Sequence, residues 1–269
     1  MQTPINTFKQ ALQNQQAQIG LWVSLANTMS TEICAGAGFD WILLDGEHTP
    51  NDLQSMLVQL QTMAAYPTHP VCRVPVGDTA LIKQYLDLGV PNLLVPMVDT
   101  PAQARALVQA CRYPPDGIRG MAGARASRWG RYPRYSAEAN AQVCLLVQAE
   151  TRLALSHLDD IAAIDGIDGV FFGPSDLSAS MGHVGNPGHP DVQAAISDGI
   201  ARVRKAGKAP GILTADNAQA RHYLELGALF VAVGLDTGIL VRGTNALVAA
   251  FKPAAAAAPA TPAKDKTYG

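Results

Sequence analysis

The feature that most constrains the fold of this chain is a regular alternation of short apolar runs with amphipathic helical segments. The apolar runs are continuous, which is typical of strands buried on both faces of a parallel sheet. We predict strands at residues 19–25, 41–44, 71–74, 93–97, 143–149, 169–173, 210–213 and 229–233. About eight strand–helix repeats in roughly 235 residues match an α/β fold, the (β/α)8 or TIM barrel, whose active sites lie at the C-terminal ends of the strands.

The segments between the strands have helical periodicity and capping residues. We predict helices at residues 30–37, 52–65, 79–88, 101–111, 152–164, 192–206, 217–226 and 237–251, with a long polar connection at 112–136. The alternative, a doubly wound open sheet, is disfavoured because no G-x-G-x-x-G motif opens the first helix. We expect one barrel domain over residues 1–253 and a low-complexity, mobile tail over 254–269.

The composition favours a large core and disfavours charged macromolecular partners. Of 269 residues, 48% are hydrophobic and 16% charged, and the formal net charge is −2. Neither nucleic acid nor a membrane is therefore an expected partner. Residues 1–18 lack the basic and apolar regions of a secretory signal. The cysteines, at positions 34, 72, 111 and 144, form no C-x-x-C pair, so we expect reduced core residues in a cytoplasmic protein.

Polar side chains follow most of the predicted strands at their C-terminal ends. In a barrel they would meet at one mouth, and they include Trp22, Ser24, Asp45, Glu47, His48, Arg73, Met97, Asp99, Gln148, Glu150, Ser175, Asp176, Thr214 and Gly234. Taken singly, a residue such as Arg73 could belong to a surface ion pair. Capping does not account for Glu150 and Asp176, which end adjacent strands.

Glu150 and Asp176 are the candidate metal ligands. Two nearby carboxylates repel each other unless a cation or a proton lies between them. A set of oxygen ligands alone suits a hard divalent ion such as Mg²⁺ or Mn²⁺, with Co²⁺ also possible. Two protein ligands leave positions for water or substrate, as in catalytic sites. The alternative is a hydrogen-bonded structural pair.

Two further residues have the chemistry of catalytic groups. His48 is the natural general base near neutral pH, and its alternative is a solvated loop histidine. Arg73 can stabilise an oxyanion or hold a carboxylate. No lysine lies at a predicted C-terminal strand end, which disfavours a Schiff-base mechanism. Asp87 ends a helix that runs away from its own barrel mouth, so any function of this residue would be at a neighbouring subunit's site.

Several motifs, in the same order along the chain, resemble the metal-dependent class II pyruvate aldolases of the HpcH/HpaI family. They are Leu44-Asp45-Gly46-Glu47-His48, Cys72-Arg73-Val74-Pro75, Leu94-Val95-Pro96-Met97, Gly117-Ile118-Arg119-Gly120, Val147-Gln148-Ala149-Glu150-Thr151 and Gly173-Pro174-Ser175-Asp176-Leu177-Ser178. The resemblance extends over residues 6–251 and implies a barrel of the phosphoenolpyruvate/pyruvate type.

The resemblance also implies residue roles. His48 matches the base, Arg73 the transition-state stabiliser, and Glu150 and Asp176 the ligands of a divalent cation. Gln148 and Ser175 match substrate-contacting positions, to which we add Trp22 and Gly173 from their place at the mouth. Asp87 matches an acid that acts on the histidine across a subunit boundary, and Asp45 lies beside that histidine as a supporting catalytic group. Glu47 is given no metal-binding role.

The resemblance implies that the function is reversible aldol cleavage of 4-hydroxy-2-oxoheptanedioate to pyruvate and succinate semialdehyde, in aromatic catabolism. The alternatives are 2-dehydro-3-deoxyglucarate or 2-keto-3-deoxyrhamnonate cleavage, and a non-catalytic barrel that binds an acidic metabolite. Residues 120–125 are shorter than the family pattern, which leaves the aldehyde preference open. A basic segment, Arg125 to Arg134, either contacts a neighbouring subunit or solvent, or captures the distal carboxylate of the substrate. The expected partners are a 2-oxo acid and an aldehyde, and the resemblance implies a homohexamer.

Overall fold

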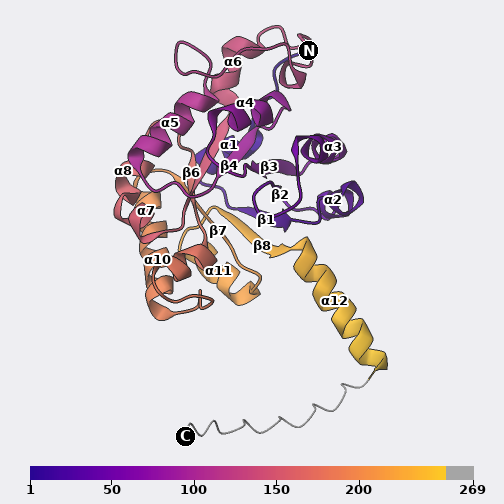
Figure 1. The fold of residues 1–269 in the computed structure, drawn as a ribbon, viewed down its shortest axis with the longest axis vertical. Coiled ribbons are helices and arrows are strands. Elements are labelled where there is room, and N and C mark those ends of the chain that lie inside the picture. The colour runs from indigo at the N-terminus through magenta and orange to yellow at the C-terminus, as the bar shows by residue number, and fades with distance from the viewer. Residues whose placement is uncertain (253–269) are drawn as a thin grey trace, which may run out of the picture.

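The computed structural model describes residues 1–252 and contains a closed barrel of parallel strands that pair in sequence order (Figure 1). The strands are β1 (Gln18–Val23), β2 (Trp41–Asp45), β3 (His69–Arg73), β4 (Asn92–Val95), β5 (Cys144–Ala149), β6 (Gly169–Phe172), β7 (Ala209–Leu213) and β8 (Phe230–Leu235). The predicted (β/α)8 barrel is confirmed, with every predicted strand present. The tail predicted at 254–269 lies outside the described residues.

The helices surround the barrel. They are α1 (Thr7–Gln13), α2 (Thr28–Ala35), α3 (Leu53–Met63), α4 (Thr79–Asp87), α5 (Pro101–Cys111), the 3₁₀ helix η1 (Arg125–Ser127), α6 (Tyr135–Gln142), α7 (Arg152–Ser156), α8 (Leu158–Ala162), α9 (Pro174–Ser180), α10 (Pro190–Lys205), α11 (Asn217–Glu225) and α12 (Asp236–Phe251). None of the helices within residues 1–252 has the length and apolar character needed to cross a membrane.

Three short α-helices, the 3₁₀ helix η1 and one helix break were missed by the sequence prediction. The predicted helix at 152–164 divides into α7 and α8 at His157, and α6 begins inside the segment predicted as an irregular connection. The helices α1 and α9 have seven residues each, too few for periodicity to distinguish them from loops. In α1 the signal was the Asn6 cap, whose side chain accepts a hydrogen bond from the Lys9 amide.

The barrel interior is filled by alternate residues of the strands. Trp41 and Leu43 of β2 belong to the interior cluster, while Ile42 and Leu44 pack against the helices. The helix α1 contributes Phe8 to the interior cluster, with its ring centroid 6.2 Å from that of Trp41. Since Asp45 continues the alternation of Trp41 and Leu43, its side chain lies above the packed interior at the barrel mouth.

The cysteines are all free, and three of them are buried, as predicted. Cys72, Cys111 and Cys144 are buried, and Cys34 is half-buried. Burial raises the pKa of each of the three buried thiols, that of Cys111 to about 12. These thiols are therefore protonated core residues without a nucleophilic role.

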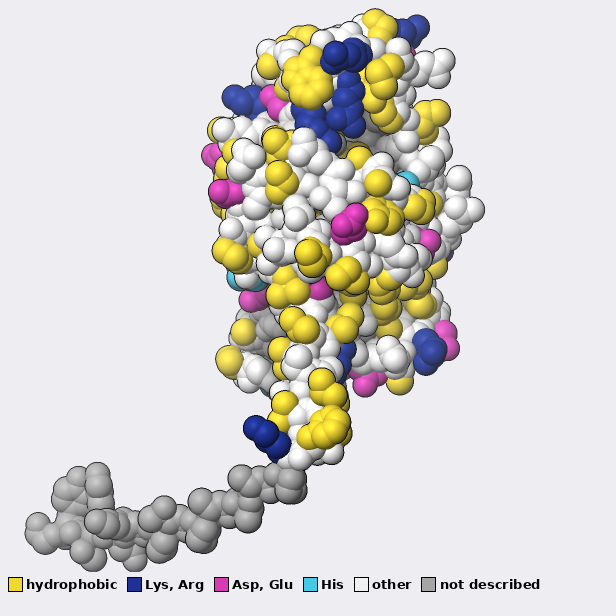
Figure 2. Space-filling view, turned by 90° about the vertical axis from the view of Figure 1, so that its right-hand side faces the viewer, with side chains coloured by type: hydrophobic (Ala, Val, Ile, Leu, Met, Phe, Trp, Pro, Cys, Tyr) yellow, Lys and Arg dark blue, Asp and Glu magenta, His cyan; other side chains and the backbone are white. Residues whose placement is uncertain are grey.

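The helix α12 does not fold back onto the barrel. It projects away from the barrel body in Figure 1, and Figure 2 shows apolar side chains along its surface. Its exposed large apolar residues are Ile239, Leu240, Val241, Leu247, Val248 and Phe251. Asp236 alone is buried in this helix, where its carboxylate accepts hydrogen bonds from the amides of Ser24 and Leu25. The root of α12 is thus fixed while its apolar face is uncovered.

Candidate active site at the barrel mouth

A cavity of about 590 Å³ opens at the C-terminal ends of the strands. The structure brings together around it these predicted residues: Trp22, Ser24, Asp45, His48, Arg73, Gln148, Glu150, Gly173, Ser175 and Asp176. The apolar side of the cavity, formed by Phe171, Leu213 and Leu235, was not predicted, because apolar residues at strand ends carry no chemical signal. The other residues predicted at the mouth do not line the cavity: Glu47, Met97, Asp99, Thr214 and Gly234. Thr214 instead donates a hydrogen bond to the Gln219 side chain.

Asp45 and Arg73 form a buried bidentate ion pair at the floor of this mouth. They are register partners on β2 and β3. Arg73 Nε donates to Asp45 Oδ1 at 2.8 Å, and Nη2 donates to Oδ2 at 2.6 Å. Trp22 Nε1 and the Glu47 amide also donate to this carboxylate, at 3.2 and 2.9 Å. Burial would raise the pKa of Asp45, but these donors and the Arg73 charge hold it below its usual value.

The remaining contacts of Arg73 fix its guanidinium plane. Its carbon Cζ lies 4.8 Å from the centroid of the Trp22 ring, a cation–π contact. The Nη1 atom lies 2.7 Å from Glu47 Oε2 and donates to Gln148 Oε1 at 3.3 Å. Arg73 is 6% exposed, so these groups hold its charge at one place in the cavity.

Glu150 is held beside Gln148 by a short network. Gln148 Nε2 donates to Glu150 Oε2 at 2.7 Å, and the Met97 amide donates to Oε1 at 2.9 Å. Met97 has a φ of 54°, a left-handed conformation that is uncommon outside glycine, and this turn aims its N–H at the carboxylate. A Cβ atom at position 173 would lie 2.3 Å from Glu150 Oε2, so Gly173 permits the carboxylate its place.

Carboxylates in and beside this cavity carry more negative charge than the nearby arginine balances. Burial and the charges of Asp176 and Glu47 raise the pKa of Glu150 to about 7. Burial, with the charges of Asp45 and Asp176, also raises the pKa of Glu47, although Arg73 and His48 oppose this. Glu47 Oε2 is buried, and its ion-pair contact with Arg73 Nη1 at 2.7 Å does not have the geometry of a hydrogen bond. An oxygen-rich site with excess negative charge fits a hard divalent cation, and the carboxylates of Glu150 and Asp176 both line the cavity.

His48 lies on the loop between β2 and α3, and its side chain is 67% exposed. The loop is tied to the end of β2, because the Asn51 side chain donates to the Asp45 carbonyl at 2.7 Å. The Nε2 atom of His48 lies 3.9 Å from Glu47 Oε2. The imidazole therefore faces the cavity from a fixed loop and is free to exchange a proton with a bound molecule.

Asp87 lies outside the cavity of its own chain. It ends α4, which begins at the mouth and runs back along the barrel. Arg119 Nη2 donates to Asp87 Oδ1 at 2.9 Å, and the guanidinium carbon of Arg119 lies 4.3 Å from the centroid of the Tyr113 ring. The sequence did not predict this partner, because Arg119 is in the polar segment predicted to be irregular and yet is 1% exposed.

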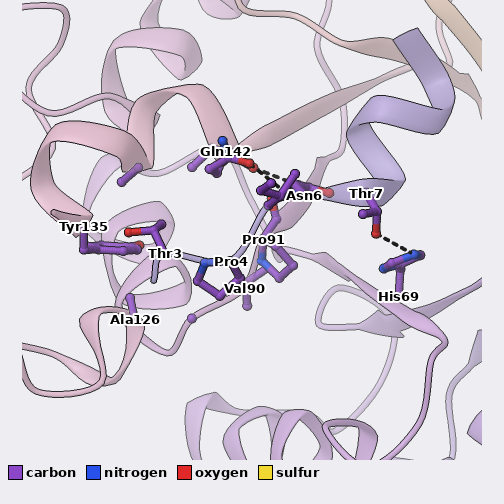
Figure 3. Close-up of a pocket in the computed structure, with 14 residues that line it drawn as sticks. Thr3, Pro4, Asn6, Thr7, His69, Val90, Pro91, Ala126, Tyr135 and Gln142 are labelled. Carbon is purple, nitrogen blue, oxygen red and sulfur yellow. Dashed lines mark hydrogen bonds between the residues drawn. The ribbon is translucent and has the colours of Figure 1, made fainter. Parts of the chain in front are cut away.

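A smaller cavity lies at the opposite end of the barrel. It has a volume of about 260 Å³ and is lined by the N-terminal segment, the residues just before β4, and α6. Figure 3 shows its hydrogen bonds between Asn6 and Gln142, and between Thr7 and His69. Within the described residues no carboxylate or cation lines it. The mouth cavity is therefore the better candidate for chemistry.

Comparison with known proteins shows what the chain is similar to. Residues 18–243 match the family described as HpcH/HpaI aldolase/citrate lyase. A hydroxypyruvate/pyruvate aldolase of Deinococcus radiodurans is 65% identical, over 92% of this chain and 90% of its own. A 4-hydroxy-2-oxo-heptane-1,7-dioate aldolase of Salmonella heidelberg is 58% identical, over 91% of this chain and 94% of its own.

A solved structure has the same fold. It is a HpcH/HpaI aldolase/citrate lyase family protein from Burkholderia cenocepacia, with a TM-score of 0.88 and 40% sequence identity. The match covers 90% of this chain and 98% of that protein.

Proposed function

The chain belongs to the HpcH/HpaI aldolase/citrate lyase family and is an aldolase, a carbon–carbon lyase; from this premise we propose that it cleaves 4-hydroxy-2-oxoheptanedioate reversibly to pyruvate and succinate semialdehyde. The proposed setting is cytoplasmic degradation of aromatic compounds. The observation that carries the proposal is one cavity that holds His48, Arg73, Glu150 and Asp176. This set combines a base, a fixed positive charge and an oxygen-ligand pair.

Each residue of the cavity has a role in the proposed cleavage. A bound divalent cation, which members of this family generally require, would be held by Glu150 and Asp176 and would act as a Lewis acid toward the 2-oxo acid. The cation in cells would be Mg²⁺, Mn²⁺ or Co²⁺. His48 accepts the proton of the C4 hydroxyl group as the C3–C4 bond breaks. Arg73 supplies positive charge where negative charge develops on the pyruvate fragment.

Other residues of the mouth bind and orient the substrate. The Gln148 amide contacts the 2-oxo acid, as does Ser175 through its backbone N–H. Trp22 and Gly173 complete the walls of this half of the cavity. Asp45 positions Arg73 through the bidentate pair, so we assign it a positioning role and no proton transfer.

The distal carboxylate of this substrate needs a cation that the mouth of one chain does not supply. Arg73 is already engaged by Asp45 and Glu47. Arg125 lies at the end of α4 close to Asp87, because its Nη1 donates to the Leu88 carbonyl. We propose that a neighbouring subunit presents Asp87 to His48 and presents the basic segment, Arg125 to Arg134, to the distal carboxylate.

A homo-oligomer is further supported by α12. An apolar groove of about 620 Å³ lies between the root of α12 and α2, and its lining includes Met29 and Ile33, each 70% exposed. Ile239 and Leu240 border the same groove. Large uncovered apolar faces mark association surfaces. We propose that two chains exchange α12, each covering the α2 face of the other, and that such dimers assemble into a hexamer.

Two assays test the proposed function. Pyruvate release is measured from 4-hydroxy-2-oxoheptanedioate and from other 4-hydroxy-2-oxo acids, including the sugar-acid substrates of the related aldolases. We expect the heptanedioate to give the highest kcat/KM and chelation with EDTA to abolish turnover until Mg²⁺, Mn²⁺ or Co²⁺ is restored. Full activity without metal would refute the ligand assignment. Binding of the acid without turnover would favour the non-catalytic alternative.

The main alternative substrate comes from the Deinococcus radiodurans relative, which is named for hydroxypyruvate and pyruvate. A preference for aldehydes without a carboxylate would favour this alternative. Replacing Arg128 and Arg131 with Ala separates the two substrates. The KM for the heptanedioate alone should rise, because its distal carboxylate loses the cation that binds it. An unchanged KM for the heptanedioate would show that the basic segment does not bind the distal carboxylate.

A further inference from the structure

A second group of metal-ligating side chains lies in the connection between α9 and α10, outside the mouth cavity. His183, His189 and Asp191 each place one ligand atom within 4.8 Å of the other two. The Nε2 atom of His183 lies 3.6 Å from Asp191 Oδ2, and Nδ1 of His189 lies 3.7 Å from the same oxygen. Within residues 1–252, no other group of three or more His, Cys, Asp or Glu side chains brings its ligand atoms this close together.

The two imidazole rings are stacked and accessible. Their centroids are 3.5 Å apart, with an angle of 13° between the planes. An imidazole ring binds a metal ion through a ring nitrogen in its neutral form. The side chains of His183, His189 and Asp191 are 26%, 31% and 70% exposed, which leaves a path for an ion from solvent.

The backbone holds these ligands near one another. The His183 amide donates to the Ser178 carbonyl at 2.7 Å, and the Asn186 amide donates to the His183 carbonyl at 2.9 Å. The His189 amide then donates to the Asn186 carbonyl at 3.1 Å. Gly185, with a φ of 72°, provides the left-handed turn between the two histidines. Folding has therefore already ordered much of the loop that a metal site would require.

One ligand nitrogen already acts as an acceptor. Nδ1 of His189 accepts a hydrogen bond from the Asp191 amide at 3.2 Å and caps α10, so this nitrogen carries no proton. An incoming ion would displace this solvent-exposed hydrogen bond from the Asp191 amide. Coordination by both histidines also requires the stacked planes to tilt apart, by rotation about their Cβ–Cγ bonds.

We propose that His183, His189 and Asp191 form a second metal site, which takes a borderline divalent ion such as Zn²⁺ or Co²⁺, with water in the remaining positions. Imidazole nitrogen suits these ions and not Mg²⁺, whereas the oxygen ligands at Glu150 and Asp176 suit Mg²⁺ and Mn²⁺. The two sites therefore differ in selectivity. A bound ion would cross-link the end of the α9 connection to the first turn of α10, while Asp176 lies at the other end of α9.

The experiment uses the full chain without a histidine tag, stripped of metal and then kept in excess Mg²⁺ to fill the carboxylate site. Zn²⁺ is titrated by calorimetry, and Co²⁺ by visible absorption. We expect one Zn²⁺ per chain. His183→Ala and His189→Ala should each weaken Zn²⁺ binding by more than about tenfold. Loss of a residue that only orients a metal ligand already weakens metal binding by about that factor.

Three control variants make the result specific. His222→Ala removes an exposed histidine on α11 and should leave Zn²⁺ binding unchanged, as should Cys34→Ser, which removes the half-buried thiol. Glu150→Gln should lose Mg²⁺-dependent turnover and retain the Zn²⁺ site, so this inference and the proposed function fail separately. No stoichiometric Zn²⁺ binding, or binding that survives the loss of both His183 and His189, would overturn the proposal.

Discussion

Replacing Asp45 with Asn removes the charge that holds Arg73 while keeping the shape of the side chain. The Asp45 carboxylate is 1% exposed and receives N–H groups from Arg73, Trp22 and Glu47. An asparagine offers one acceptor oxygen and turns the other position into a donor. At least one of the two Arg73 hydrogen bonds must then be lost, and the guanidinium keeps Glu47 as its one ion-pair partner.

The expected loss of stability follows from the burial of the pair. Removing one partner of a buried ion pair costs about 3–5 kcal/mol, because the other charge is left uncompensated. Glu47 Oε2, 2.7 Å from Arg73 Nη1, offsets part of this loss. We therefore expect the free energy of unfolding to fall by about 3 kcal/mol, the lower end of that range. We expect kcat to fall by about 10²–10³, the effect of losing one preorganised donor.

Urea unfolding measures the first quantity, and pyruvate release measures the second. Asp52→Asn is the matched control, because Asp52 is an exposed helix cap seven positions away and asparagine caps equally well. It should change neither quantity.

The dependence on pH adds a further check. The lowered pKa of Asp45 means that its contribution is complete above the ordinary aspartate value and is lost as the pH falls through the lowered one. The stability difference between the wild type and Asp45→Asn should therefore be constant from about pH 5 to 8 and narrow below about pH 4. An Asp45→Asn protein with wild-type stability and kcat at pH 7 would refute the positioning role.

Other predictions concern the cation site, the subunit boundary and α12. Because the pKa of Glu150 is raised to about 7, its contribution to stability is present below the ordinary glutamate value and is lost as the pH rises through 7. In metal-free protein, the free energy of unfolding of Glu150→Gln should therefore rise by about 3 kcal/mol relative to that of the wild type as the pH increases from 5 to 8. Equal pH profiles of the two unfolding free energies would contradict this. Added Mg²⁺ should raise the Tm of the wild type at pH 8 but not that of Glu150→Gln, and an equal rise in both would exclude Glu150 as a ligand. Mixing inactive His48→Ala and Asp87→Ala subunits should restore part of the activity, and no recovery after verified subunit exchange would place Asp87 outside the site. Replacing Ile239 and Leu240 with Asp should shift sedimentation toward the monomer, and an unchanged oligomer would exclude α12 as the interface.

One property of the strands made both the barrel and most of its mouth predictable from the sequence. Parallel strands covered by helices are apolar on both faces, so each strand stands out as a continuous apolar run, and the first polar residue after it marks the mouth. The strand pattern alone therefore places Asp45, Arg73, Gln148 and Glu150 at one end of the barrel. The short helices α1 and α9 escaped prediction because seven residues do not establish a period.

Contacts between distant segments were not predictable. The sequence placed Glu47 near the mouth but did not predict its contact with Arg73 at 2.7 Å, which forms because the β2 loop folds over the end of β3. His183 and His189 gave no signal, because turns in the connecting loop decide whether their rings meet. The partnership of Asp87 with Arg119 likewise crosses a segment without regular structure.

The sequence by itself determined the order of the elements, the closed parallel architecture and the chemical types at the mouth, because strand periodicity and burial are local properties of the chain. Only the tertiary structure decided which charges neutralise one another. It paired Asp45 with Arg73, left the carboxylate of Glu150 short of positive charge, and left the apolar face of α12 uncovered. Pairing depends on distances of a few ångströms between residues far apart in the chain, where electrostatic energy changes steeply with separation and burial.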